Sequence, residues 1–151
     1  CMTVPRVLTN GENGTLLQNP VPELAARRTA AQPLADDVAV HTAPCFDLTA
    51  APAGDFCLTV AQGVQLVYTE QNRTCVLRFA DAVQHTDFAG GRTERRVQLA
   101  APCRRVRVVG DHSSLEIFLN EGAAVFSTRY YPAPGDVTLQ LQGAEGTVYS
   151  L

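Results

Sequence analysis

The sequence predicts an all-β protein whose strands form a two-sheet antiparallel β-sandwich, with one short N-terminal helix. From residue 38 onward, apolar and polar residues alternate with a period of two in many short segments, which is typical of half-buried strands. Turn residues separate these segments, and roughly eleven strands spaced about 8–12 residues apart favour a sandwich or barrel. Strands that are apolar on one side only indicate antiparallel sheets with one face buried and one exposed to water. Two such apolar faces form a core when the sheets pack together.

The first part of the chain holds the less regular elements. Residues 3–18 read as two short extended stretches around a turn at residues 10–14, which are rich in Asn and Gly. Residues 23–28 are the one convincing helix candidate, about two turns long, because Pro22 stands where a helix start tolerates proline. We expect residues 29–37 to form a loop.

A regular series of strands follows this loop. In one of them Phe56, Leu58 and Val60 alternate with more polar residues, and polar turns separate neighbouring strands. We expect a polar loop at residues 84–92. The alternating segments are residues 46–48, 56–60, 64–68, 75–79, 97–99, 106–108, 115–119, 125–130, 137–141 and 147–151.

Residues 108–132 are predicted to form a β-hairpin. In its first strand, Leu115, Ile117 and Leu119 form an aliphatic row on one face, and they alternate with Glu116 and Phe118 on the other face. Asn120-Glu121-Gly122 supplies turn chemistry, since Asn and Gly tolerate positive φ. Phe118 and Phe126 are out of step with the aliphatic row, so we expect both to fill the second face.

Composition narrows the class of protein. The 151 residues suffice for one domain, and the net charge of −3 argues against a nucleic-acid binder. No apolar run has the length of a membrane span, and no signal segment opens the chain. The five Cys are odd in number and lack a Cys-x-x-Cys pair, so we expect free thiols and no zinc site. Free thiols favour a cytoplasmic protein, with secretion as the alternative.

Residues 111–122 read Asp-x-Ser-Ser-x-Glu-x-Phe-x-Asn-x-Gly and are followed by Phe-Ser-x-Arg at residues 126–129. This run resembles the signature of the C-terminal β-sandwich domain of glycoside hydrolase family 32. Residues 1–8, 17–24 and 91–96 are similar to further family motifs and occur in family order, although His112 stands where the family usually has Arg.

The resemblance implies a lectin- or glucanase-like sandwich that follows an N-terminal catalytic propeller. The family's Trp-Met-Asn-Asp-Pro-Asn, Arg-Asp-Pro and Glu-Cys motifs, which carry its catalytic acids, do not occur in this chain. We therefore expect residues 1–151 to be a single C-terminal domain without catalytic residues, cofactor or metal. The start at Cys1 rather than Met suggests a fragment.

Six residues of the signature are candidates for structural or interdomain roles: Asp111, Ser114, Glu116, Asn120, Gly122 and Arg129. We expect Glu116 and Arg129 to pair across the hairpin, with Arg105, Arg107 or the propeller as alternative partners. Asp111 and Glu116 are a weak pair of glycosidase acids, because residues five apart in one strand point to opposite faces. We expect residues 111–114 to form a turn in which Asp and Ser side chains bind backbone amides. A Ser-His-Asp hydrolase built from these neighbours is also a weak candidate, since triads assemble across a fold.

Three functions remain open at this point. The first is an accessory domain that supports the propeller of a β-fructofuranosidase acting on sucrose or sucrose 6-phosphate, and that contributes to a homodimer. The second is a fructan-binding module, for which Tyr130 and Tyr131 are the best stacking platform. The third is an extracellular adhesion domain, which would favour paired Cys.

Overall fold

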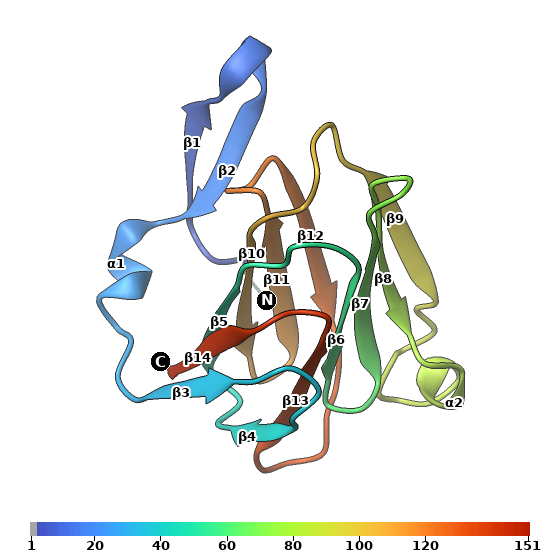
Figure 1. Ribbon diagram of the computed structural model, residues 1–151. Helices are drawn as coiled ribbons and strands as arrows, with labels where there is room; N and C mark the ends of the chain where they lie inside the picture. Colours follow the sequence, from blue (N-terminus) through green and yellow to red (C-terminus); the bar gives the residue numbers. More distant parts are fainter. Residues whose placement is uncertain (1–2) are drawn as a thin grey trace.

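The computed structural model describes residues 3–151, so Cys1 and Met2 lie outside the described part. Two six-stranded antiparallel sheets face each other, and a separate two-stranded hairpin projects from them (Figure 1). The described residues contain fourteen strands, more than expected, because short edge strands escape a search for alternation. Among them, no helix is long and apolar enough to cross a membrane.

Sheet I holds the predicted hairpin and has the strand order β12-β11-β10-β5-β14-β3. Its strands are β3 (Ala31–Leu34), β5 (Phe46–Ala50), β10 (Val106–Asp111), β11 (Ser114–Leu119), β12 (Ala124–Arg129) and β14 (Gly146–Ser150). The loop expected at residues 29–37 is thus partly wrong, because β3 pairs with β14 at the sheet's edge. An edge position is where a strand tolerates proline, and β3 contains Pro33.

Sheet II has the order β4-β13-β6-β7-β8-β9. Its strands are β4 (Val40–Thr42), β6 (Phe56–Val60), β7 (Val64–Thr69), β8 (Thr74–Phe79), β9 (Glu94–Gln98) and β13 (Val137–Gln142). Because β6 and β7 each bury every second residue, the face toward sheet I is apolar. The core between the sheets includes Phe46, Leu48, Leu66, Ile117 and Leu139, each at most 1% exposed.

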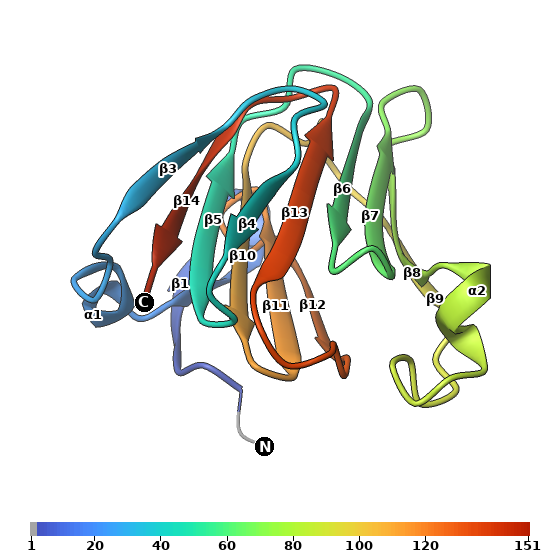
Figure 2. The same ribbon diagram turned by 90° about the horizontal axis from the view of Figure 1, so that it is seen from below.

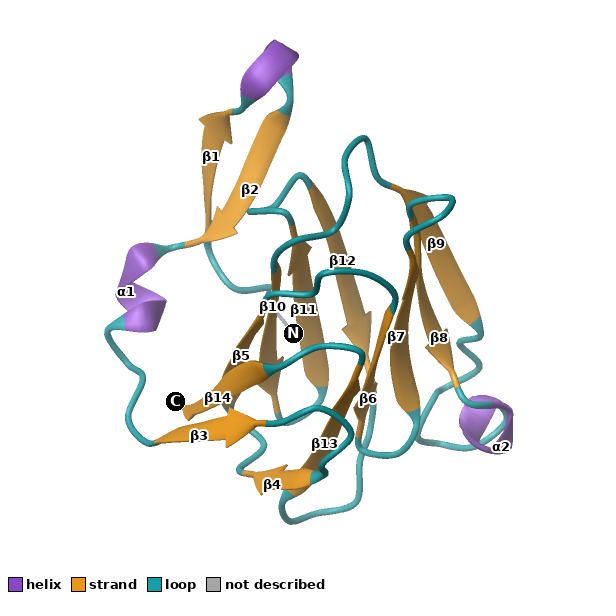
Figure 3. Cartoon of the chain, viewed as in Figure 1, coloured by secondary structure: helices purple, strands orange, loops and turns teal. Residues whose placement is uncertain are grey.

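Helix is confined to short turns at the periphery (Figure 3). The expected N-terminal helix exists as α1 (Pro22–Ala25), one turn rather than two, with its proline in the first turn. A second helix, α2 (Asp81–Gln84), lies between the strand expected at residues 75–79 and the loop expected at residues 84–92, and it was not predicted. Figure 2 shows α1 beside β3 and α2 at the opposite side, beside β8 and β9.

The N-terminal hairpin joins β1 (Arg6–Asn10) to β2 (Leu16–Pro20) through a 3-10 turn, η1 (Glu12–Gly14). It projects away from the sandwich in Figures 1 and 3. Leu8 and Leu16 remain 59% and 50% exposed on it, so this hairpin carries apolar surface that the sandwich does not cover.

The register of the signature hairpin decides which face each aromatic ring joins. The turn pairs Leu119 with Ala124 and Ile117 with Phe126, so Phe126 shares the core face. Phe126 belongs to the core cluster, and the expectation that it fills the second face is wrong. Phe118 does lie on the outer face, opposite Val125, and is 2% exposed there.

Candidate functional site

The centre of the outer face of sheet I is buried, although it points away from the core. Asp47, Val109, Glu116 and Phe118 alternate with core residues along β5, β10 and β11, yet none is more than 4% exposed. The side chains of Arg6 and Arg28, in the N-terminal segment, reach onto this face. This segment, residues 3–30, is therefore fastened to the sheet mainly by polar contacts.

Glu116 forms the first of these contacts, and its partner is Arg6 of β1. The Arg6 Nη2 atom lies 2.5 Å from Glu116 Oε2 and 2.8 Å from the Ser127 hydroxyl, while Nη1 donates to Gln18. The guanidinium also lies 5.5 Å from the centre of the Phe118 ring. Glu116 faces Ser127 across the hairpin rather than Arg129, so the expected Glu116–Arg129 pair is wrong.

Asp47 makes the second contact and was not among the predicted site residues. Its carboxylate is 0% exposed and accepts from Arg107 at 2.9 and 2.6 Å, and from Arg28 Nε at 2.9 Å. Arg28 also stacks 4.3 Å from the centre of the Tyr149 ring. Two guanidinium groups thus offset the burial of one carboxylate, and one of them comes from the N-terminal segment.

Gly122 makes the third contact, between backbones. Its φ is +82°, and a Cβ placed there would lie 2.1 Å from the carbonyl oxygen of Gln18. The Gly122 carbonyl accepts from the Gln18 amide at 3.0 Å. Glycine at this turn therefore allows β2 to approach the signature hairpin closely.

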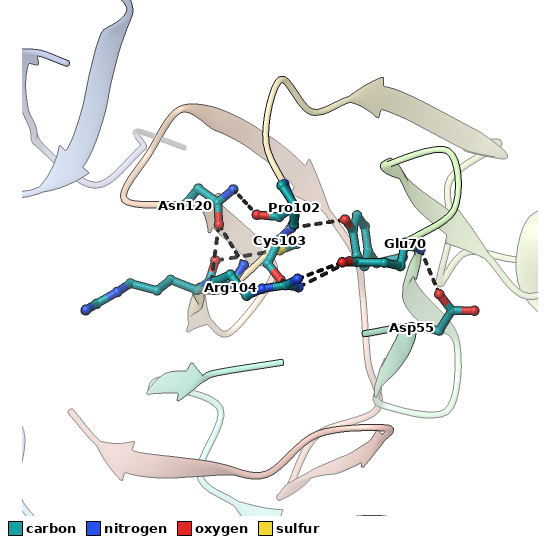
Figure 4. A network of polar contacts seen from close by, with 8 residues as sticks. Asp55, Glu70, Pro102, Cys103, Arg104 and Asn120 are labelled. Carbon is teal, nitrogen blue, oxygen red and sulfur yellow. Dashed lines mark hydrogen bonds and ion pairs between the residues drawn. The ribbon is translucent and has the colours of Figure 1, made fainter. Parts of the chain in front are cut away.

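Asn120 and Glu70 link the two sheets at the same end of the molecule. Asn120 Oδ1 accepts from the Arg104 and Arg105 amides, and its Nδ2 donates to the Pro102 carbonyl. Arg104 reaches across to Glu70, in the β7–β8 turn, with bonds of 2.7 and 3.2 Å (Figure 4). The Arg104 guanidinium holds the pKa of Glu70 below its ordinary value of 4.5, so Glu70 is unsuited to donate a proton.

Arg129 and Ser114 stabilise the opposite end of the hairpin. Residues 112–113 form the β10–β11 turn, as predicted, and Arg129 donates to both the carbonyl and the hydroxyl of Ser113. The Ser114 hydroxyl donates to the Asp111 carbonyl at 3.5 Å. Within residues 3–151, no backbone amide donates to the Asp111 carboxylate, which instead contacts Cys45 and His112. That detail of the predicted turn is wrong.

The predicted aromatic platform is divided between the interior and the surface. Tyr130 is 0% exposed, and burial raises the pKa of its phenol to about 12. Its ring packs edge-on against Phe88, with centroids 5.9 Å apart. Tyr131 is 45% exposed and lies 5.5 Å from the Arg129 guanidinium. A sugar ring can reach Tyr131 but not Tyr130.

Asp111 and Glu116 do not form a glycosidase pair. Because they lie on neighbouring strands, both occupy the outer face in diagonal positions, contrary to our expectation for one strand. Glu116 is held by Arg6, and the pocket that Glu116 lines does not include Asp111. The two acids therefore lack the shared cleft that hydrolysis of a glycoside requires.

The signature residues also exclude a nucleophilic triad. His112 directs the same atom, Nδ1, toward Asp111 at 3.0 Å and toward Cys45 at 3.4 Å. In a triad the two ring nitrogens contact different partners. Burial and the bond to Asp111 raise the pKa of the Cys45 thiol, which disfavours a thiolate nucleophile.

A pocket of about 260 Å³ lies beside Glu116 and Ser127. Three arginines line it, Arg92, Arg95 and Arg129, and none is within ion-pair distance of a carboxylate among the described residues. Thr3, at the start of the described chain, also lines this pocket. The pocket is thus suited to acidic groups.

Two acidic residues and the cysteines outside the signature also have structural roles. Asp36 accepts from the Gly143 amide, and Asp37 accepts from the side chains of Gln140 and Gln142. Cys45, Cys57, Cys75 and Cys103 are free thiols, as expected. Burial raises the pKa of Cys75 to about 12 and that of Cys103 to about 11, so these two behave as inert core groups.

The long-range partners Arg28, Asp47 and Glu70 were missed by reasoning from sequence. Asp47 and Glu70 were isolated charges and Arg28 followed Arg27, among twelve basic and fifteen acidic residues, and no local pattern marked any of the three. Arg6 could have been singled out from the sequence, because it belongs to the Thr-x-Pro-Arg run near the start of the chain.

Comparison with known proteins independently tests the resemblance to glycoside hydrolase family 32. Residues 19–151 match the family described as Glycosyl hydrolases family 32 C terminal. The chain is 30% identical to sucrose-6-phosphate hydrolases of Bacillus subtilis, over 90% of this chain and 29% of that protein, and of Escherichia coli, over 97% and 32%. It thus spans about a third of the length of these relatives.

Solved structures share the fold. The Bombyx mori GH32 beta-fructofuranosidase BmSUC1 superposes with a TM-score of 0.79 at 20% identity, over 99% of this chain and 32% of that one. The sucrose-6-phosphate hydrolase from Lactobacillus gasseri gives a TM-score of 0.78 at 17% identity, over 97% and 33%. At these identities the similarity establishes the fold alone.

Proposed function

Since the chain belongs to the C-terminal domain family of glycosyl hydrolases family 32, we propose that it is a non-catalytic accessory domain. Its role is to stabilise the catalytic propeller of a β-fructofuranosidase that hydrolyses sucrose or sucrose 6-phosphate. The relatives in Bacillus subtilis and Escherichia coli bear the name of that second activity.

One observation carries this proposal: the signature residues hold the N-terminal segment rather than a reactive centre. Glu116 binds Arg6, and the Gly122 backbone binds β2. Some signature residues also line the pocket of about 260 Å³, but Glu116 is the one acid among its described lining residues, so the pocket lacks the second carboxyl that hydrolysis of a glycoside requires. The segment they hold is the one that leads toward a preceding domain.

Two surfaces suit contact with that domain. The β1–β2 hairpin exposes Leu8 and Leu16, and exposed apolar groups of this kind mark interaction sites. The pocket lined by Arg92, Arg95 and Arg129 offers three guanidinium groups to carboxylates of the propeller. Arg129 would then stabilise the turn of its own hairpin and also contact the propeller at the domain interface.

The first experiment assays the 151-residue chain on sucrose and on sucrose 6-phosphate. We expect no turnover above the buffer control, because Asp111 and Glu116 share no cleft in the described part of the chain. Turnover that survives repurification would overturn the accessory role.

The second experiment uses the longer enzyme in which the family places this domain. Leu8→Ser with Leu16→Ser should lower the thermal midpoint of the catalytic domain and leave KM unchanged. Val38→Ser, at a position that is 52% exposed elsewhere in the chain, is the matched control and should have no effect. Equal midpoints for both variants would contradict docking through the hairpin.

A fructan-binding role has less support, because Tyr130 is buried and Tyr131 alone makes a small platform. Calorimetric titration with inulin oligosaccharides tests it, and no heat is expected. Free thiols at the four described cysteines support the proposal of a cytoplasmic enzyme and oppose an adhesion domain. A homodimer stays part of the proposal, to be checked by sedimentation.

A further inference from the structure

At one corner of sheet I, Cys45 meets two neighbouring potential metal ligands that are distant from it in sequence, Asp111 and His112. β10 pairs with β5, and the register that places Gly110 opposite Phe46 brings Asp111 beside Cys45. His112 follows in the β10–β11 turn, with a φ of +21°. The Cys45 carbonyl accepts from the Leu151 amide, and Arg129 holds the next turn residue, so backbone contacts support both loops.

The three ligand atoms form a compact triangle. Asp111 Oδ1 lies 3.0 Å from His112 Nδ1 and 3.5 Å from Cys45 Sγ, and Sγ lies 3.4 Å from Nδ1. Tetrahedral Zn²⁺ with bonds of about 2.0–2.3 Å keeps its sulfur, nitrogen and oxygen ligands about 3.3–3.6 Å apart. The observed separations need to change by only about 0.3 Å to match this geometry.

We propose that Cys45, Asp111 and His112 form a binding site for Zn²⁺, with a fourth position open to solvent. The side chains of Asp111 and His112 are 64% and 75% exposed, so an ion can enter without rearrangement of the core. Thiolate and imidazole ligands select Zn²⁺ over Ca²⁺ and Mg²⁺, which prefer oxygen. Zn²⁺ would replace the thiol proton, which passes to solvent, and two negative ligands would balance its charge.

This site goes beyond the proposed function, since an accessory domain needs no metal. It also differs from our expectation of no metal site, which rested on the absence of a Cys-x-x-Cys pair. Within the part of the chain that the structure describes, this is the one group of three such side chains with mutually close ligand atoms. Its role would be to clamp the β4–β5 loop to the signature hairpin.

The test uses the 151-residue chain in a Cys1→Ser background, so that the terminal thiol cannot contribute. Titration with Co²⁺ should produce a thiolate-to-cobalt charge-transfer band that saturates at one equivalent, and Zn²⁺ should abolish it. Cys45→Ser should remove the band, and His112→Asn should weaken Zn²⁺ binding by more than the about 10- to 100-fold that loss of a supporting partner costs. Asn suits the second variant because it tolerates positive φ.

Cys57→Ser is the matched control, because Cys57 is also a half-buried free thiol, but its one hydrogen-bond partner among the described residues is Thr59. It should keep both the band and the affinity. Absence of a band at one equivalent, or its survival in Cys45→Ser, would overturn the proposal. Alkylation of Cys45, followed by mass spectrometry, is a second test that needs no ligand variant: Zn²⁺ should protect Cys45 and leave Cys57 reactive, and equal rates with and without Zn²⁺ would contradict the site.

Discussion

Arg6 and Glu116 form a 2.5 Å ion pair although 110 positions separate them in the chain. Their side chains are 20% and 5% exposed, so the pair lies largely under the N-terminal segment. It joins the first strand of the described chain to the centre of the signature hairpin. The pair therefore contributes to holding the N-terminal segment on sheet I.

Glu116→Gln should destabilise the domain by about 2–3 kcal/mol, because it leaves a largely buried guanidinium without its counter-charge. Urea unfolding followed by circular dichroism measures the change. The control is Glu94→Gln, which removes the solvent-exposed pair with Arg96 and should cost less than about 1 kcal/mol. Equal losses in the two variants would mean that the Arg6–Glu116 pair is not a special anchor.

Two buried tyrosines should respond oppositely to loss of the hydroxyl. Tyr68 accepts from the Cys103 amide at 3.0 Å, so Tyr68→Phe should cost about 1–2 kcal/mol by leaving that amide unpaired. The Tyr130 hydroxyl has no hydrogen-bond partner within residues 3–151, and Tyr130→Phe should be neutral or stabilising by up to about 1 kcal/mol. Thermal unfolding distinguishes the two, and a larger loss at Tyr130 would contradict this account.

Gly110 is required because the Phe46 ring lies over it. A Cβ at this position would be 2.2 Å from the ring, so Gly110→Ala should cost about 1–3 kcal/mol through overpacking. Adding Phe46→Leu should make the alanine less costly, a non-additivity that a double-mutant cycle detects. Gly54→Ala meets nothing within 4 Å and should change stability little. A similar cost at both glycines would refute the steric explanation.

The Glu70–Arg104 contact should make stability depend on pH. Because the folded state holds the pKa of Glu70 below 4.5, chiefly through Arg104, the contact stabilises the protein above pH 4.5. This contribution is lost as pH falls below 4.5 and through the lowered folded value. Urea midpoints of the wild type and Glu70→Gln should therefore differ at neutral pH and converge in acid.

The matched background for that experiment is Arg104→Gln, which removes the largest cause of the lowered Glu70 pKa and leaves the smaller effect of the hydrogen bond with Tyr68. In this background Glu70→Gln should alter the pH profile much less than it does in the wild type. An undiminished difference there would assign the pH dependence to another partner of Glu70.

Local patterns predicted the sandwich well and its irregular parts poorly. Period-two alternation located the inner strands, and the Asn120–Gly122 turn was recognised because few residues adopt positive φ. The edge strand that contains Pro33 was taken for loop, and α2 is too short to show a helical period. Phe126 was assigned to the wrong face because the turn, rather than the strand, determines the parity of its pairing.

By itself, the sequence determined that this chain is an antiparallel sandwich and that its signature lies on a hairpin, because alternation and turn chemistry act over a few residues. Only the tertiary structure decided the partners: Arg6 with Glu116, Arg28 with Asp47, and Cys45 with Asp111 and His112. These contacts depend on the strand order and on the path of the N-terminal segment across sheet I. Such arrangements follow from packing between distant parts of a chain, which no local period encodes.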